Sequence, residues 1–293
     1  MTNHANFFAP AKINLFLAVT GKRADGFHDL VSVAAPLAFG DTLRVEPDGA
    51  FSLACSDPEV PVDETNLVLK AARAFAAQTG WRGGAKFFLE KRIPMGAGLG
   101  GGSSDAVAAL RATNTLAGTL LAEPAITEIA MTLGADCPLF LQAGPVVMRG
   151  RGERIETLPP QVAARLQGRR LLVFKPGFGI ATPWAYGAMA ARPEYYLPAD
   201  EAEEGLKTWM DDETATAEKI LSNNMEHVAF EKFVALPALL GQLRAEFALE
   251  PRMSGSGSAC FALLRNEAPV AAITQVIHAA WGASAFVTET TIR

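Results

Sequence analysis

Five glycines and two serines are concentrated in the eleven residues from Pro94 to Ser104, between a segment with strand character and a segment with helix character. Because glycine has no Cβ atom, such a segment can adopt positive φ angles and bring its backbone N–H groups close to an anion. A helix that begins within it would direct unpaired N–H groups and the positive end of its dipole to the same place. The segment therefore predicts a phosphate-binding site. This glycine loop consists of Pro94, Met95, Gly96, Ala97, Gly98, Leu99, Gly100, Gly101, Gly102, Ser103 and Ser104.

Three better-known phosphate-binding patterns compete for the glycine loop. Residues 96–101 satisfy G-x-G-x-x-G, which indicates a dinucleotide fold only where a second parallel strand and an acidic residue follow about 20 residues later. Here a loop at Gly118 and a second helical segment at 123–133 follow instead. A Walker loop needs Gly-Lys-Ser/Thr and a protein kinase needs H-R-D and D-F-G, all of which are absent from the sequence. A glycine-rich turn without a ligand remains the alternative for the loop taken alone.

Composition limits the class of protein and its partners. The chain has 293 residues, 49% hydrophobic and 19% charged, which is enough for two globular domains. Its net charge of −5 argues against nucleic acid as a partner, so anionic ligands must be met by local groups. The sequence has no run of 18 apolar residues and no basic leader, so we expect no membrane span and no signal peptide. Three isolated cysteines and four scattered histidines predict a cytoplasmic protein without disulfides and leave the metal ligands unknown.

Apolar residues with alternating or helical spacing divide the chain into strands and helices. We interpret the acidic segment 199–218 as a solvated helix and loop. Strands come first and are then interleaved with helices, which predicts an α+β protein. The pattern restarts near residue 160, so one domain is expected at 1–160 and another at 161–293. Strands are expected at 11–20, 42–46, 51–54, 85–89, 146–148, 171–174, 259–264 and 285–290, and helices at 66–78, 103–117, 123–133, 228–247 and 268–280.

Two further motifs accompany the glycine loop. One is Pro10-Ala11-Lys12-Ile13-Asn14-Leu15 near the start, and the other is Met253-Ser254-Gly255-Ser256-Gly257-Ser258-Ala259 near the end. Together, and in this order, the three segments resemble the GHMP kinase superfamily of small-molecule kinases. That superfamily uses an N-terminal P-A-K-x-N motif, a P-x-x-x-G-L-G-S-S phosphate loop and a C-terminal glycine-rich loop that closes over the site.

Within the superfamily, the chain is most similar to the kinases that act on a cytidine-diphosphate sugar alcohol in non-mevalonate isoprenoid biosynthesis. The extra glycines of the loop carry this similarity, together with residues 20–28 (TGKRADGFH) and 133–138 (LGADCP). The resemblance implies a two-domain fold, with an N-terminal β/α sandwich that holds a nucleotide site of the left-handed-crossover type and a C-terminal ferredoxin-like domain. It also implies that ATP phosphorylates the C2 hydroxyl of the cytidyl-linked methylerythritol, with Mg²⁺, in a cytoplasmic monomer or weak homodimer.

Lys12 and Asp136 are the residues that the resemblance places in catalysis. Phosphoryl transfer mainly requires charge neutralisation and positioning, and Lys12 supplies a cation on an otherwise apolar strand. Asp136 lies on a turn between Gly134 and Pro138, where it would accept or orient the proton of the attacking hydroxyl. The alternatives are a lysine whose amine reaches solvent and a turn or capping aspartate. The two serines of the loop would contact phosphate or a magnesium-bound water, or cap the helix that follows.

Substrate recognition is implied for a second set of residues. Phe27 and Tyr186 fall where the similar kinases hold cytosine between two aromatic rings, and His28 falls where it would read the edge of the pyrimidine. For an aromatic residue taken alone, core packing is the alternative. The other positions that the resemblance implies are Asn14 and Thr182 at the substrate, and Asn66 and Lys91 near the adenosine of ATP.

Some positions depart from the pattern expected of these kinases. Phe27 stands where tyrosine is commoner, Cys137 follows the aspartate, Asn224 replaces the aspartate of a usual N-D-x-E motif, and segment 192–219 has no assigned role. The alternative functions are another superfamily member, such as a homoserine or mevalonate kinase or a diphosphomevalonate decarboxylase, and a nucleotide-binding sensor without catalysis. Another superfamily member would not need Phe27, His28 and Tyr186 together. A sensor would not need to keep both Lys12 and Asp136.

Overall fold

The computed structural model describes residues 4–293, which form two compact units. The first comprises the described residues up to Ala11, Phe39–Pro94 and Gly100–Ala143, and the second comprises Lys12–Ala38, Met95–Leu99 and Gly144–Arg293. The units are interleaved along the sequence, because strands β1 (Ala5–Lys22) and β2 (His28–Asp48) contribute residues to both. The bounds of these units differ from the domain boundary near residue 160 that the sequence predicts. The two domains at 1–160 and 161–293 stay a prediction.

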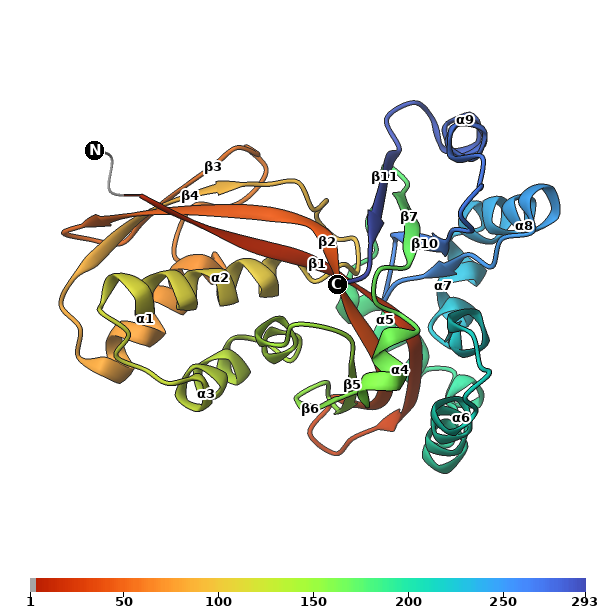
Figure 1. The fold of residues 1–293 in the computed structure, drawn as a ribbon, viewed down its shortest axis with the longest axis horizontal. Helices are drawn as coiled ribbons and strands as arrows, with labels where there is room; N and C mark the ends of the chain where they lie inside the picture. The colour runs from red at the N-terminus through yellow and green to blue at the C-terminus, as the bar shows by residue number, and fades with distance from the viewer. Residues whose placement is uncertain (1–3) are drawn as a thin grey trace. The chain divides into compact units, whose positions relative to one another are not determined.

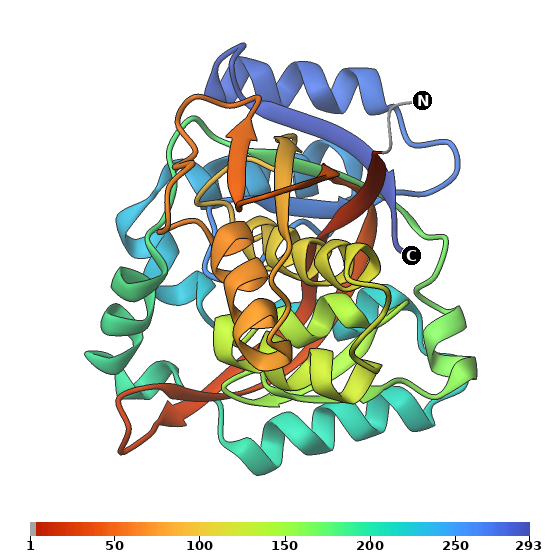
Figure 2. The same ribbon diagram turned by 90° about the vertical axis from the view of Figure 1, so that its left-hand side faces the viewer.

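The first unit is built from strands and helices that flank the second half of the glycine loop. Strand β4 (Gly84–Glu90) pairs antiparallel with the second half of β2 and parallel with β3 (Ser52–Cys55). Alternate residues of β4 are buried, as expected for a strand with one face on the core. Both ribbon views show α1 beside α2 under these strands (Figures 1 and 2). The helices of this unit are α1 (Leu67–Thr79), α2 (Gly101–Leu116), α3 (Glu123–Leu133) and the short 3₁₀ helix η1 (Cys137–Leu141).

The second unit contains an antiparallel sheet with the strand order β11-β7-β10-β9. Helices α8 and α9 lie together beside this sheet (Figure 1), and the rings of Phe174 on β7 and Trp281 on α9 are 5.6 Å apart. Elsewhere in this unit, β1 pairs parallel with β8, and the first half of β2 pairs with β5, which pairs with β6. The strands are β5 (Val146–Gly150), β6 (Arg154–Thr157), β7 (Arg170–Lys175), β8 (Ser222–Asn223), β9 (Arg252–Met253), β10 (Cys260–Leu263) and β11 (Phe286–Thr291). The helices are α4 (Pro160–Ala164), α5 (Thr182–Ala190), η2 (Pro193–Tyr195), α6 (Ala199–Asp211), η3 (Ala217–Ile220), α7 (Glu226–Lys232), α8 (Ala235–Phe247) and α9 (Val270–Trp281).

Most predicted elements are confirmed within a few residues, and the α+β class is confirmed. The single helix predicted at 228–247 is wrong, because α7 ends before Phe233 and α8 begins at Ala235. Phe233 leaves helical geometry, and its ring stacks on Phe178 at 5.3 Å and meets Trp184 edge-on at 5.3 Å. Pro237 lies four residues after Phe233 and has no N–H to bond to the Phe233 carbonyl, so one helix ends here and the proline falls in the first turn of the next. Among the described residues, no helix is both long enough and apolar enough to cross a bilayer.

Candidate active site

In the second unit, the three sequence motifs meet at Gly98 of the glycine loop. Lys12 N donates to Leu99 O at 2.9 Å, and Ala259 N donates to Ala97 O at 3.0 Å. The glycine loop is therefore hydrogen-bonded to both the N-terminal and the C-terminal motif. Gly98 has a φ of +74°, and its carbonyl accepts a hydrogen bond from Ser254 Oγ at 3.1 Å. A Cβ atom at Gly98 would lie 2.2 Å from the backbone oxygen of Ser254. Glycine is therefore required here by both its positive φ and the close approach of the C-terminal loop.

Lys12 and Asn14 form a buried polar cluster beside this crossing. Lys12 Nζ donates to Asn14 Oδ1 at 2.6 Å, and Asn14 Nδ2 donates to Ser32 Oγ at 2.8 Å. The two residues are only 5% and 6% exposed, so the Lys12 amine does not reach into solvent as the alternative would require. A Cβ atom at Gly255 would lie 3.3 Å from both Lys12 Nζ and Asn14 Oδ1. The C-terminal loop thus passes directly over the amine, which is well placed to meet an anion.

The C-terminal glycine-rich loop (253–259) is held in place by Asn223, a residue that the sequence did not single out. Asn223 Nδ2 donates to Met253 O at 2.8 Å and to Gly255 O at 2.9 Å. Glu226 Oε1 accepts from Met253 N at 2.7 Å, and burial raises the pKa of this glutamate. The hydroxyls of Thr182 and Ser256 are 3.0 Å apart, which joins the predicted substrate residue Thr182 to the same loop. Asn223 opens the segment 223–226 (NNME), which corresponds to the N-D-x-E motif of the similar kinases, and this motif could have indicated its importance.

In the first unit, helix α2 begins at the second half of the glycine loop. Gly100 precedes the helix with a φ of +71°, and Ser104 N donates to Gly100 O at 3.0 Å. The N–H groups of the first turn therefore lie at an open helix start, which favours anion binding. Ser104 Oγ is buried and has no hydrogen-bond partner among the described residues. Residues 4–293 also contain no cluster of three His, Cys, Asp or Glu side chains suited to a metal ion.

Asp136 occupies a tight turn that packs against the start of α2. It is half-buried at the N-cap position of η1, and Cys137 N donates to Gly134 O at 3.1 Å to close the turn. The Cys137 thiol is hydrogen-bonded to the Ser103 hydroxyl, and burial raises the pKa of the thiol to about 11. A Cβ atom at Gly134 would lie 3.4 Å from Cys137 Sγ and 3.7 Å from Ser103 Oγ. Cys137 is thus an unreactive residue that ties the aspartate turn to the glycine loop.

Asn66 and Lys91, predicted near adenosine, have structural roles in the first unit. Asn66 caps α1, because its Oδ1 accepts from Val68 N at 2.9 Å. The Lys91 amine lies between two buried carboxylates, 2.5 Å from Asp41 Oδ2 and 2.8 Å from Asp105 Oδ2. A Cβ atom at Gly101 would lie 2.9 Å from that amine, so the ion-pair cluster supports the first turn of α2 from below. Contact of Asn66 and Lys91 with ATP stays a prediction.

The two carboxylates of this cluster differ in their other partners. Asp41 Oδ1 accepts hydrogen bonds from the backbone N–H groups of Arg92 at 2.5 Å and Ile93 at 2.7 Å, which stabilises its charge. Asp105 Oδ1 is buried and has no hydrogen-bond partner among the described residues. Burial, together with the neighbouring Asp41 charge and against the effect of Lys91, raises the pKa of Asp105 to about 7. Folding therefore favours the protonated form of Asp105.

This assignment predicts a pH-dependent stability. With a pKa raised from 3.8 to about 7, folded Asp105 retains a proton that the unfolded chain has lost. The stabilisation is complete below pH 4 and is lost as pH rises through 7, with a slope of up to about 1.4 kcal/mol per pH unit. In Asp105→Asn this slope should disappear from the free energy of unfolding measured in urea between pH 5 and 8. Asp41→Asn should instead lower stability by about 3–5 kcal/mol, because it breaks the buried pair. Parallel pH profiles for wild type and Asp105→Asn would contradict the assignment.

Of the predicted substrate residues in the second unit, His28 and Tyr186 lie together, whereas Phe27 is exposed beside Arg151. His28 is 7% exposed, and its ring centroid lies 4.9 Å from that of Tyr186, so the structure brings these two together. Tyr196, which no sequence signal indicated, contributes a hydroxyl 3.1 Å from His28 Nε2. Phe27 is 54% exposed and lies under the guanidinium of Arg151, whose Cζ is 4.8 Å from the ring centroid. Phe27 is therefore not a core residue, and its stacking on cytosine stays a prediction.

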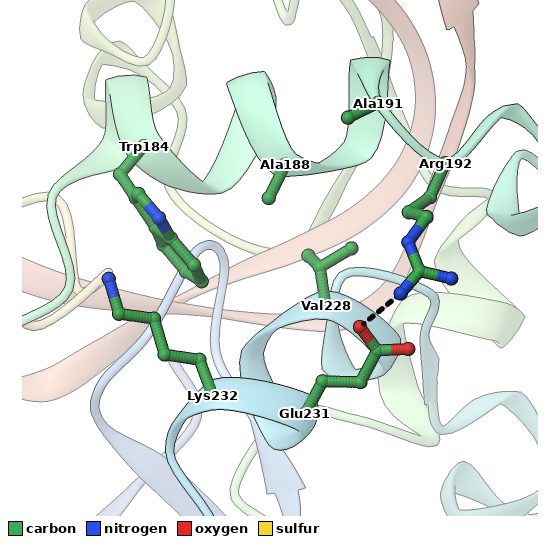
Figure 3. A pocket seen from close by; sticks show the side chains of 7 residues that line it. All are labelled: Trp184, Ala188, Ala191, Arg192, Val228, Glu231 and Lys232. Carbon is green, nitrogen blue, oxygen red and sulfur yellow. Dashed lines mark hydrogen bonds and ion pairs between the residues drawn. The ribbon is translucent and has the colours of Figure 1, made fainter.

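A separate cavity of about 330 Å³ lies between α5 and α7 (Figure 3). Two of its charged groups form an ion pair, Arg192 with Glu231 at 3.2 Å, and the third, the Lys232 amine, lies 4.2 Å from the centre of the Trp184 ring. None of the predicted site residues lines this cavity. Its lining residues are Trp184, Ala188, Ala191, Arg192, Val228, Glu231 and Lys232.

Comparison with known proteins agrees with this geometry. The family model for the GHMP kinases N terminal domain matches residues 66–144, which contain the glycine loop and Asp136. The 4-diphosphocytidyl-2-C-methyl-D-erythritol kinase of Cereibacter sphaeroides is 40% identical over 282 residues, covering 93% of this chain and 94% of its own. The crystal structure of a 4-(cytidine 5'-diphospho)-2C-methyl-D-erythritol kinase is 36% identical, with a TM-score of 0.77 over 98% of this chain and 99% of that one.

The homoserine kinase from Cytophaga hutchinsonii has a similar TM-score of 0.76 over 100% of this chain and 96% of its own, but only 17% identity, so it shares the fold alone. The resemblance and the GHMP kinase fold predicted from the three motifs are confirmed. The chain is a small-molecule kinase, and it belongs to the GHMP kinases, in the family whose members are named 4-diphosphocytidyl-2-C-methyl-D-erythritol kinase.

Proposed function

We propose that the protein transfers the γ-phosphate of ATP to the C2 hydroxyl of 4-diphosphocytidyl-2-C-methyl-D-erythritol. The observation that carries the proposal is the buried Lys12–Asn14 pair beneath the crossing of Gly98 and Ser254. It gathers the P-A-K-x-N motif and both glycine-rich loops around one cation. The names of the relatives that cover nearly the whole chain support the choice of acceptor.

Asp136 and Lys12 have distinct roles in the proposed reaction. The C2 oxygen attacks the γ-phosphorus, its proton passes to the Asp136 carboxylate, and the bond to the β,γ-bridging oxygen breaks as ADP leaves. Lys12 balances the negative charge of the transferring phosphoryl group. Its hydrogen bond to Asn14 aims the amine, because the 2.6 Å contact fixes the end of a long, flexible side chain. The glycine loop and the start of α2 contribute backbone N–H groups to the phosphates.

Mg²⁺ fits the site as a companion of the nucleotide. Magnesium keeps several waters and is often held through substrate phosphates with few protein ligands, which agrees with the lack of an acidic cluster in residues 4–293. Ser104 Oγ, buried and without a described partner, would contact a phosphate oxygen or a magnesium-bound water. When bound, the ion neutralises charge on the phosphates.

The proposal also places the enzyme in the cytoplasm, as a monomer or weak homodimer. All three cysteines are free thiols, and Cys137 and Cys260 are buried in the protein interior. A reducing compartment suits such a chain.

A coupled assay of ADP release tests the proposed acceptor. The purified protein is given ATP, Mg²⁺ and one of three acceptors at equal concentration: the cytidyl substrate, mevalonate or homoserine. We expect turnover with the cytidyl substrate at a kcat/KM at least a hundredfold above the other two. Preference for mevalonate or homoserine would reassign the protein within the superfamily. Tight ATP binding without ADP release for any acceptor would favour the non-catalytic sensor.

A further inference from the structure

Tyr196 belongs to the segment 192–219, for which the sequence suggested no role, yet it contacts a predicted recognition residue. Its hydroxyl lies 3.1 Å from His28 Nε2, and the two ring centroids are 5.9 Å apart. Tyr186 packs on the same imidazole at 4.9 Å. His28 is thus bounded by two tyrosine rings, one of which also forms a hydrogen bond to it.

The backbone around Tyr196 is fixed by a residue that departs from the family pattern. Asn224 Oδ1 accepts from Val19 N at 2.8 Å, and its Nδ2 donates to Val19 O at 2.8 Å and Tyr195 O at 2.9 Å. Leu197 N also donates to Val19 O, at 3.2 Å. The carboxylate of an aspartate could accept the first of these bonds but could not donate the other two. Asparagine at position 224 therefore joins the Tyr195–Tyr196 segment to β1, together with the backbone hydrogen bond of Leu197.

The hydrogen bond to Tyr196 determines how the imidazole of His28 can meet a ligand. Burial and the nearby Lys22 charge lower the pKa of His28, so the ring is neutral at physiological pH. In a neutral imidazole one nitrogen donates and the other accepts. A tyrosine hydroxyl can donate to an unprotonated Nε2 or accept from a protonated one, so the bond fixes the position of the ring in either tautomer. The same edge of the ring is then presented to a pyrimidine, which carries both donors and acceptors.

We propose that Tyr196 is a positioning residue for nucleobase recognition, which holds the His28 ring in one orientation, and that Asn224 holds Tyr196 in place. This inference rests on the proposed function for the identity of the base. It assigns a role to part of the segment 192–219. It also explains why asparagine stands at position 224, where the similar kinases usually have aspartate.

Tyr196→Phe tests the proposal, because it keeps the ring and removes only the hydroxyl. We expect the KM for the cytidyl substrate to rise about three- to tenfold, as for loss of one hydrogen bond, with kcat and the KM for ATP unchanged. Tyr195→Phe is the matched control, because its hydroxyl bonds to Glu231 instead of His28, at 2.5 Å. The control should keep the wild-type KM. Asn224→Asp should raise the KM in the same direction, and Asn224→Asp combined with Tyr196→Phe should add little to Tyr196→Phe alone.

The second readout requires no substrate. Nitrogen NMR of ¹⁵N-histidine protein, with His28→Gln to assign the signals, reports the hydrogen bonding of each ring nitrogen. We expect the His28 Nε2 signal to shift in Tyr196→Phe, which removes the partner of that nitrogen, and to keep its wild-type position in Tyr195→Phe. An unchanged Nε2 signal in Tyr196→Phe overturns the proposal, as does an unchanged KM. If wild type fails to use the cytidyl substrate, the proposed function fails, while the NMR measurement still decides whether Tyr196 positions His28.

Discussion

In Asp136→Asn, we expect kcat for the cytidyl substrate to fall by about 10²–10⁴-fold, the usual cost of removing a positioned general base. The amide that replaces the carboxylate cannot accept the proton of the attacking hydroxyl. Asparagine has nearly the same size, so the turn closed by the Cys137 N to Gly134 O hydrogen bond should persist. Affinity for a non-hydrolysable ATP analogue, measured by calorimetry, should therefore stay within about twofold of wild type.

The control for this experiment is Asp211→Asn, which changes an exposed carboxylate at the end of α6. It should leave kcat and thermal stability unchanged, because surface substitutions of this kind usually have small effects. A folded Asp136→Asn protein with a kcat close to that of wild type would exclude Asp136 as the base.

Gly98→Ala is expected to damage both the nucleotide site and the fold around it. The added Cβ would lie 2.2 Å from Ser254 O, and the residue would have to hold a φ of +74°. The backbone conformation alone costs about 1–2 kcal/mol for a residue other than glycine, and the clash adds to that cost. The atoms nearest to this Cβ, Ser254 O at 2.2 Å and Gly257 N at 3.0 Å, belong to the backbone. The backbone of the loop must therefore move. We expect stability measured in urea to fall by at least about 2 kcal/mol, and affinity for an ATP analogue to fall at least about tenfold.

Gly205→Ala separates this effect from the general cost of changing glycine. Gly205 lies within α6, and nothing lies within 4 Å of a Cβ atom there. Alanine should stabilise that helix by roughly 0.5–1 kcal/mol and leave ATP affinity unchanged. Equal ATP affinity in Gly98→Ala and wild type would show that the glycine loop does not approach the phosphates.

The sequence was most informative where function depends on local backbone chemistry. Glycine permits the positive φ angles found at Gly98 and Gly100, so the backbone form of the glycine loop and the helix that follows it could be predicted without a structure. This loop needs only neighbours in the sequence. The burial of Lys12 and Asn14 could not be anticipated in the same way, because it depends on Ser32 and Gly255, which lie far away in the chain.

Features that depend on distant residues could not be predicted. Asp41 and Asp105 meet at Lys91 only because β2, β4 and α2 pack together, and no spacing in the sequence indicates such a cluster. Tyr196 reaches His28 from 168 residues away, through a segment whose acidic composition suggested only a solvated surface. The break between α7 and α8 is different, because Pro237, four residues after Phe233, cannot donate to the Phe233 carbonyl and is a local signal that the helical spacing concealed.

Two departures from the family pattern acquire physical explanations. Cys137 follows Asp136 as a buried thiol that is hydrogen-bonded to Ser103, and burial raises the pKa of this thiol to about 11. Asn224 donates two hydrogen bonds that an aspartate could not donate. Phe27 keeps an exposed aromatic face beside Arg151, and nothing in the structure explains the preference for phenylalanine over tyrosine.

The most direct test of the central claim is the ³¹P NMR spectrum of the product formed from ATP and the cytidyl substrate. The C2 atom of that acceptor carries a methyl group and no hydrogen, so phosphorus attached through its oxygen shows no splitting by a carbon-bound hydrogen. We predict one new phosphomonoester signal, an unsplit line, that grows in step with ADP. A new signal split into a doublet or triplet would place the phosphate on another hydroxyl. Release of ADP together with inorganic phosphate and no new phosphomonoester would contradict phosphoryl transfer to this substrate.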